Sequence, residues 1–140
     1  MSEGDLTKTG IKGLDAILLG GIPKSNVILV QGVTGSGKTL MGLQFIYRGI
    51  VEYNEPGLIV VFETSPDKLV RDAAGFGWNL DELQRRKKLQ IIFTSPEVFA
   101  TARNAAMSEI RISRPSFIRM PSSTNRASSR LIVTRVTPTR

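Results

Sequence analysis

The sequence predicts an α/β fold with a parallel sheet, and three observations support this prediction. Apolar runs at Asn26–Gln31, Leu58–Phe62 and Leu89–Phe93 have the length and composition of buried strands. Segments in which apolar residues recur at helical spacing separate these runs. A glycine-rich loop, Gly32–Thr39, joins the first run to the helical segment after it. Strands that alternate with helices at this spacing are typical of βαβ units, whose neighbouring strands run parallel.

Three helices are expected between and beside these strands. The first runs from about Lys38 to Glu52 and has an apolar face at helical spacing. The second begins at Ser65-Pro66-Asp67, which supplies a capping hydroxyl, a proline at the first helical position and an acid facing the helix dipole. It runs to about Phe76, and the third helix spans roughly Leu80–Lys87. A shorter helical pattern at Leu14–Leu18 precedes the first strand.

The composition is that of an ordinary globular protein. Of the 140 residues, 41% are apolar and 22% are charged. No apolar run is long enough to cross a bilayer, and the first five residues do not resemble a signal peptide. The chain has no cysteine and no histidine, so we expect neither a disulfide framework nor a His/Cys zinc site. We therefore expect a cytoplasmic protein without membrane contact.

The segment from Gly32 to Thr39 matches the phosphate-binding P-loop consensus, G-x-x-x-x-G-K-[ST], at every fixed position. Its glycines allow consecutive backbone N–H groups to point at phosphate oxygens, and the helix that follows adds its positive dipole end. Lys38 would reach the β- and γ-phosphates, and the Thr39 hydroxyl would ligate Mg²⁺. The loop therefore predicts a site for ATP and Mg²⁺. The expected nucleotide-binding residues are Gly32, Val33, Thr34, Gly35, Ser36, Gly37, Lys38, Thr39 and Leu40.

Six short segments between residues 7 and 99 resemble one family of P-loop proteins. They are Thr9–Asp15, Gly20–Pro23, Leu43–Gly49, Glu55–Gly57, Phe62-Glu63 with Ser65-Pro66, and Phe76–Trp78. Together they resemble the KaiC-like branch of the RecA-like P-loop ATPases. The resemblance implies a three-layer parallel sheet with helices on both faces, here incomplete at its C-terminal side. Residues 1–99 are then the N-terminal part of a KaiC/RecA-like ATPase core.

The resemblance also implies a catalytic residue, Glu63, at the end of the second strand. In this family a carboxylate at that position activates the water that attacks the γ-phosphate, and a general base needs hydrogen-bond reach of that water. The family usually has two adjacent glutamates, and the second position here is Thr64. Two further departures precede the P-loop, where Leu19 and Ser25 replace glycines that the family often uses.

Residues 100–140 differ in character from the rest of the chain. The formal net charge is +7, and this excess lies entirely after residue 99, where eight arginines face one acid, Glu109. The segment also has seven serines and five threonines but neither glycine nor lysine. We expect an Arg/Ser/Thr-rich tail that is disordered or is translated from the wrong reading frame. Its one apolar run, Leu131–Val133, is followed by Thr134 and Arg135, so it lacks the acid that would orient the Mg²⁺ shell.

These features favour an ATP-binding protein with a truncated KaiC-like ATPase core. The family hydrolyses ATP, and some of its members also phosphorylate themselves. Its full-length members form hexameric rings. The resemblance does not carry this assembly over to this chain. Two alternatives stay open: a recombinase-like DNA-associated ATPase, and an inactive fragment. Nucleic acid is not the favoured partner, because the basic tail has no interleaved aromatic residues to stack on bases.

Overall fold

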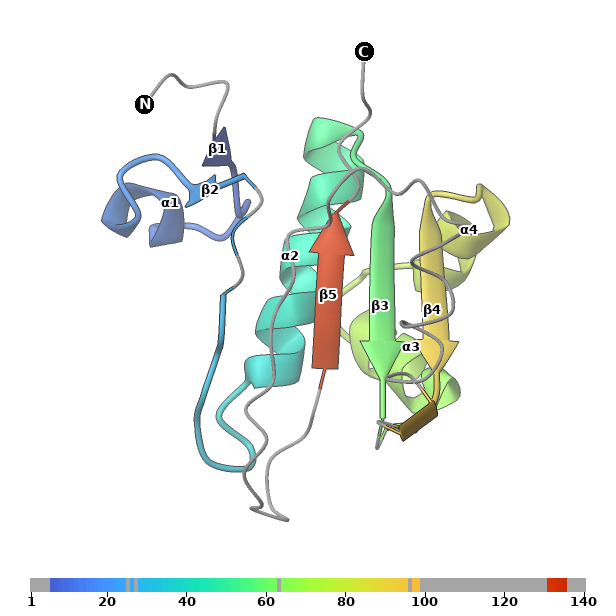
Figure 1. The fold of residues 1–140 in the computed structure, drawn as a ribbon. Helices are drawn as coiled ribbons and strands as arrows, with labels where there is room; N and C mark the ends of the chain where they lie inside the picture. Colours follow the sequence, from blue (N-terminus) through green and yellow to red (C-terminus); the bar gives the residue numbers. More distant parts are fainter. Residues whose placement is uncertain are drawn as a thin grey trace.

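A three-stranded sheet in the order β4–β3–β5 forms the centre of the computed structural model (Figure 1). Its strands are β3 (Gly57–Val61), β4 (Leu89–Phe93) and β5 (Leu131–Arg135). The structure describes residues 6–24, 26, 28–62, 64–95 and 97–98, together with the backbone of residues 131–135. Within this part of the chain, no helix is long and apolar enough to span a membrane.

Strands β3 and β4 run parallel and in register, from Gly57 beside Leu89 to Val61 beside Phe93. Both strands lie where the sequence predicts them, within one residue at each end. The connection between them contains α3 (Pro66–Ala74) and α4 (Leu80–Arg85). It is therefore the βαβ unit that alternating strands and helices indicate.

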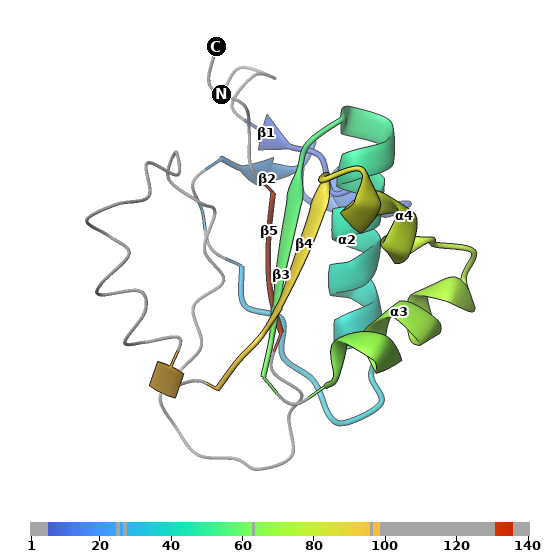
Figure 2. The same cartoon turned by 90° about the vertical axis from the view of Figure 1, so that its right-hand side faces the viewer.

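The helices α2 (Lys38–Tyr53), α3 and α4 all lie on one face of the sheet (Figure 2). Their buried apolar side chains and those of the strands form a single core: Leu43, Ile46, Ile50, Ile59, Val61, Leu69, Ala73, Leu80, Leu83 and Leu89. Helix α2 crosses β3 very closely. A Cβ atom on Gly57 would lie only 2.6 Å from Cγ2 of Ile46. The described helices thus form one of the two helical layers of the expected three-layer fold.

The helix ends follow the capping signals of the sequence. The Ser65 hydroxyl accepts a hydrogen bond from the Lys68 N–H at 3.4 Å, and Pro66 occupies the first position of α3. The Asn79 side-chain oxygen caps α4 in the same way, at 3.0 Å from the Glu82 N–H. Both helices therefore begin where a side chain satisfies an otherwise unpaired backbone donor.

The prediction of a strand at Asn26–Gln31 is wrong. The described residues of this segment form no strand, and the side chains of Leu29 and Val30 are 47% and 36% exposed. The two edges of β3 are occupied by β4 and β5, so neither edge is free for this segment. An apolar run becomes a strand only if it finds a backbone partner, and this run lies beside the sheet without one among the described residues.

Strand β5 was not expected, because it lies in the predicted tail. It runs antiparallel to β3, from Leu131 beside Val61 to Arg135 beside Gly57, and it also contacts α2. The sheet is consequently mixed rather than purely parallel. The rest of the predicted tail lies outside the described residues.

A small N-terminal unit lies beside the sheet. It contains α1 (Leu14–Ile17), which confirms the short helical pattern, and a two-residue antiparallel pair of β1 (Leu6–Thr7) with β2 (Ile22–Pro23). The Asp15 carboxylate accepts hydrogen bonds from the backbone N–H groups of Thr9, at 2.7 Å, and Gly10, at 3.3 Å. These bonds close the loop that leads into α1.

One residue of this unit has a strained backbone. Leu19 has φ 54°, in the left-handed region that side chains with a Cβ rarely adopt, and its side chain is 90% exposed. Glycine, which the family resemblance leads us to expect at this position, adopts this conformation without strain.

Candidate functional site

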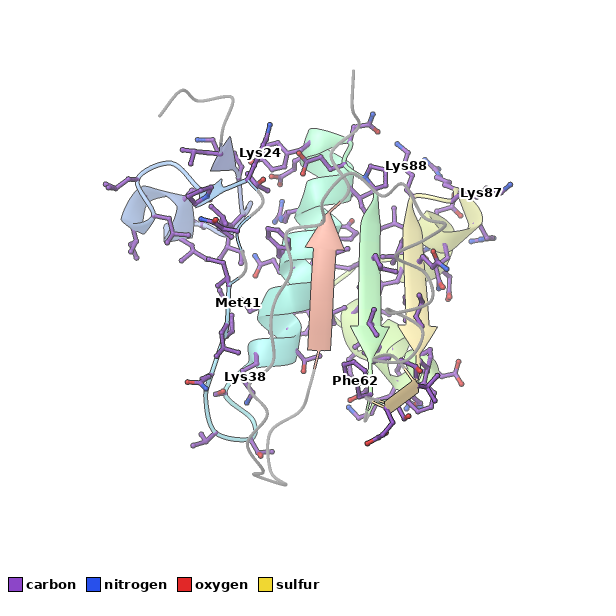
Figure 3. The ribbon with its side chains drawn as sticks, viewed as in Figure 1. Lys24, Lys38, Met41, Phe62, Lys87 and Lys88 are labelled. Carbon is purple, nitrogen blue, oxygen red and sulfur yellow. The ribbon has the colours of Figure 1, made fainter. Side chains whose placement is uncertain are left out.

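The predicted P-loop lies at the end of the sheet where β3 and β4 finish. Figure 3 shows Lys38 at this end, near the level of Phe62, the residue that follows β3. The labelled residues Lys24, Lys87 and Lys88 lie at the opposite end of the molecule. Carboxyl ends of parallel strands are the common location of ligand sites in open α/β sheets, so the loop is in the expected place.

The glycines of the loop are required for two different reasons. Gly35 and Gly37 both have φ 83°, and a Cβ on either would meet no atom within 4 Å, so backbone conformation alone favours glycine there. Gly32 is required by a close approach, because a Cβ at that position would lie 2.5 Å from the Ser36 hydroxyl oxygen. The motif glycines therefore fold the loop tightly back on itself.

The side chain of Lys38 curls over the loop that precedes it. Its ammonium donates hydrogen bonds to the carbonyl oxygens of Gly32, at 2.8 Å, and Val33, at 2.7 Å. The Ser36 hydroxyl is a third, longer partner at 3.4 Å. A full positive charge is thus held over the loop, where a bound phosphate would be close to it. The sequence analysis did not assign this contact to Ser36; a hydroxyl two residues before the lysine is the signal that could have suggested it.

Helix α2 begins directly at this lysine, and its amino end differs from those of α3 and α4. Gly37 precedes the first helical residue and offers no side-chain cap, and the first turn of α2 contains no acid. In contrast, α3 and α4 each have a side-chain cap and at least one acid in the first turn. The amino end of α2 thus has neither the capping side chain nor the first-turn acid that the other two helices possess. Such an uncapped amino end is a ready anion site, since both the N–H groups and the helix dipole favour negative charge.

The loop is open to solvent. Residues 31–37 are exposed, and Lys38, Thr39 and Leu40 in the first turn of α2 are half-buried. Thr39, the predicted Mg²⁺ ligand, therefore lies beside the loop at the start of the helix. No group of three or more carboxylate, histidine or cysteine side chains that could hold a metal occurs in the described part of the chain.

The predicted catalytic residue, Glu63, lies outside the described residues. Its neighbours in sequence, Phe62 and Thr64, follow β3 at the end of the sheet that carries the loop. Strand β5 contains no acid, and because it runs antiparallel its last residue, Arg135, pairs with Gly57 at the far end of β3. The antiparallel direction agrees with the sequence expectation that this run does not supply the acid of the Mg²⁺ shell.

A basic cluster at the end of α4 is remote from the loop. Arg85 and Arg86 form ion pairs with Glu82 at 2.8 Å and 2.7 Å. The hydrogen bond from Arg86, together with the positive charges of both arginines, lowers the pKa of Glu82 below its ordinary value. These pairs stabilise the last turn of a helix, as cations near a helix carboxyl end generally do.

Comparison with known proteins identifies what the chain resembles. The family model described as "ATPase: KaiC" matches residues 7–133. The "Circadian clock oscillator protein KaiC" of Prochlorococcus marinus (strain MIT 9313) is 45% identical over 89 residues, which are 64% of this chain and 18% of that protein. The KaiC of Synechococcus elongatus is 44% identical over 90 residues, which are 64% of this chain and 17% of that protein.

A solved structure of a KaiC-like protein is also similar to this chain. The crystal structure of a KaiC-like protein from the hyperthermophilic archaeon Pyrococcus horikoshii OT3 matches with a TM-score of 0.60 and 40% sequence identity. The match covers 62% of this chain and 38% of the archaeal chain. The fold of the described part is thus a partial α/β arrangement of the RecA-like P-loop type. The chain spans less than a fifth of the length of the curated relatives, 17–18% in the two described above.

Proposed function

We propose that this chain, which belongs to the KaiC ATPase family, binds ATP with Mg²⁺ through Gly32–Thr39 and the adjoining Leu40. The observation that carries the proposal is the amino end of α2. Among α2, α3 and α4, only α2 has an amino end with neither a side-chain cap nor an acid in its first turn. This amino end directly follows the glycine-rich loop and begins at the lysine of the motif. Anion-binding groups converge there, and the first turn of α2 contains no acid.

Each part of the site has a distinct role in this proposal. Backbone N–H groups between Gly35 and Lys38 would bind the α- and β-phosphates, because the left-handed glycines allow the loop to wrap around them. Lys38 would exchange its two carbonyl partners for oxygens of the β- and γ-phosphates, which form stronger, charge-assisted hydrogen bonds. The Thr39 hydroxyl would ligate Mg²⁺, with the remaining ligands supplied by phosphate and water.

Hydrolysis is the family activity, and we propose that its rate in this chain is very low or undetectable. Glu63 would be the base, but the second glutamate of the family pattern is Thr64. No acid follows the only apolar run near the end of the chain, and β5 points away from the loop. Positioned bases and electrostatic groups each contribute factors of about a hundred or more to a rate, so the loss of two is severe.

We do not extend the ring assembly of full-length relatives to this chain. The chain is proposed to bind nucleotide as a truncated ATPase core. Neither nucleic acid nor a membrane is a favoured partner. The chain spans too little of its relatives to carry over their assembly or their clock function.

A thermal-shift measurement tests nucleotide binding. A ligand that binds only the folded protein stabilises it by about 2.7 kcal/mol at a hundredfold excess over Kd. For a chain of this size that stabilisation raises Tm by roughly 8–10 °C. Lys38→Ala should lose most of the shift caused by Mg-ATP. The matched control is Lys24→Ala, which removes an exposed lysine at the opposite end of the molecule (Figure 3) and should keep the full shift. An equal shift in Lys38→Ala and in the unaltered protein would contradict the proposal.

A further inference from the structure

Strand β4 has a free edge in the described part of the chain. It pairs with β3 on one side, and no described strand pairs with its other side. Figure 2 views the sheet from this side, and no described helix or strand passes in front of β4. The edge is therefore accessible to a further strand as far as the described elements are concerned.

The hydrogen bonds at the two ends of the β3–β4 ladder show which backbone groups point outward. The Gly57 N–H donates to the Lys88 carbonyl at 2.8 Å, and the Thr94 N–H donates to the Val61 carbonyl at 3.1 Å. In a parallel pair, alternate residues of a strand bond to the same neighbour. Residues 88, 90, 92 and 94 therefore face β3. The N–H and C=O groups of residues 89, 91 and 93 face away from it.

The residues of this edge lack the charges, prolines and glycines that commonly prevent strands from pairing. Leu89–Phe93 contains no charged residue, no proline and no glycine, and the side chain of Phe93 is 57% exposed. Exposed apolar edges without such features are templates for another strand. Charged residues flank the strand on both sides, at Arg85–Lys88 before its first residue and at Glu97 after its last.

We propose that two copies of this chain pair through β4, antiparallel and centred on Ile91. In this register the outward groups of Ile91 exchange two hydrogen bonds with the partner's Ile91. Leu89 exchanges two more with the partner's Phe93, and Phe93 does the same with the partner's Leu89. All the outward N–H and C=O groups of the strand are then satisfied by one two-fold axis. The contact is isologous and closed, and it joins the two sheets into one of six strands.

Charge selects the antiparallel direction. Lys87 and Lys88 lie at the amino end of β4, and in the antiparallel pair each copy's lysines lie beyond the carboxyl end of the other copy's strand. The two basic ends are then separated by about 17 Å of strand, which exceeds the Debye length of about 8 Å. A parallel pair would place the two basic ends side by side. A second copy that pairs with this edge therefore has its strand reversed.

Light scattering after size exclusion, without nucleotide, tests the pairing. The unaltered protein should have twice the 15.4 kDa mass of one chain, falling toward one chain on dilution. Ile91→Pro removes an outward N–H without touching the ladder to β3, so it should give a single chain. Ile91→Val is the matched control and should remain paired, because it keeps the N–H. A single-chain mass for the unaltered protein up to millimolar concentration would overturn the proposal, and so would a paired Ile91→Pro protein.

A second variant keeps the test decisive if Ile91→Pro does not fold. Phe93→Lys changes an exposed side chain and places an ammonium beside the partner's Leu89, close to the partner's Lys88, so the mass should again halve. Amide hydrogen exchange gives an independent readout. Protection at residues 89, 91 and 93 should rise with protein concentration, while residues 90 and 92 stay protected at every concentration. Protection of all five that does not depend on concentration would show that the chain covers this edge itself, which overturns the proposal.

Discussion

Gly10→Ala should lower the free energy of unfolding by about 2–3 kcal/mol, for two separable reasons. Gly10 has φ 69°, in the left-handed region. A Cβ there would also lie 2.5 Å from Cβ and 3.2 Å from Cγ of Arg48, a residue of α2. The N-terminal unit thus contacts α2 at a point where no side chain fits.

The magnitude follows from the two costs taken separately. The left-handed conformation costs a residue with a Cβ about 1–2 kcal/mol. Alanine recovers about 0.4–1 kcal/mol of this, because it restricts the unfolded chain more than glycine does. Overlap with the stem of Arg48 adds about 1–3 kcal/mol, since Cβ cannot move without shifting the helix.

Gly13→Ala is the matched control. Gly13 has φ 82° in the same segment, but a Cβ there would meet no atom within 4 Å. It should therefore show the conformational cost alone, about 1 kcal/mol or less. The difference between the two variants measures the packing of the N-terminal unit on α2.

Urea unfolding followed by fluorescence of Trp78 is a suitable assay. Trp78 is the only tryptophan, and its ring stacks on Tyr47 of α2 at a centroid distance of 5.5 Å and on Phe76 at 5.2 Å. Its emission therefore reports on the core that α2 forms. Equal decreases in the free energy of unfolding of Gly10→Ala and Gly13→Ala would refute the contact with Arg48. No decrease in either variant would mean that the N-terminal unit unfolds independently of that core.

Four further predictions concern other parts of the chain. Leu19→Gly should raise the free energy of unfolding by about 0.5 kcal/mol in the same urea assay, because it relieves left-handed strain at an exposed position. ATP turnover should stay far below about 1 per second; turnover near that rate that vanishes in Glu63→Gln would show that the missing acids are dispensable. The pKa of Glu82 is lowered chiefly by Arg86, so its contribution to stability is complete at neutral pH and is lost as pH falls below about 5. Glu82→Gln should remove this part of the acid sensitivity in urea titrations at pH 7 and pH 3. Translation of the gene beyond codon 99 in the other two frames should yield a helix and then an apolar strand ending in Asp; two closed or aperiodic frames would show that residues 100–140 must be explained as they stand.

Most elements of the fold were predictable because their signals are local. The start of α3 lies at Ser65-Pro66 in both sequence and structure, since capping and proline geometry involve only neighbouring residues. The strands at Gly57–Val61 and Leu89–Phe93 lie within one residue of their predicted bounds. The predicted end of α3 at Phe76 is two residues late, because the chain turns from Gly75 onward.

The elements that could not be predicted depend on distant partners. The two-residue strands β1 and β2 exist only because Leu6 lies beside Pro23, and such short segments have no periodicity to detect. Two apolar runs, Leu131–Val133 and Asn26–Gln31, have similar composition, but only the first lies in a strand that pairs with β3. Nothing in either run alone encodes that choice, because it depends on which run can reach the edge of β3 while packing on α2.

The place of the Gly32–Thr39 loop at the start of a helix was predictable even though the strand before the loop was not, and α2 explains why. A P-loop is commonly positioned by the strand that enters it, but Ile28–Gln31 forms no strand here. The loop is instead positioned from its other side. Helix α2 begins at Lys38 and packs so closely across β3 that Gly57 has no room for a Cβ against Ile46. This packing fixes the axis of the helix relative to the sheet, and therefore fixes where its amino end lies. The glycines and the lysine determine the shape of the loop locally, so the site needs only that one helix to be in place.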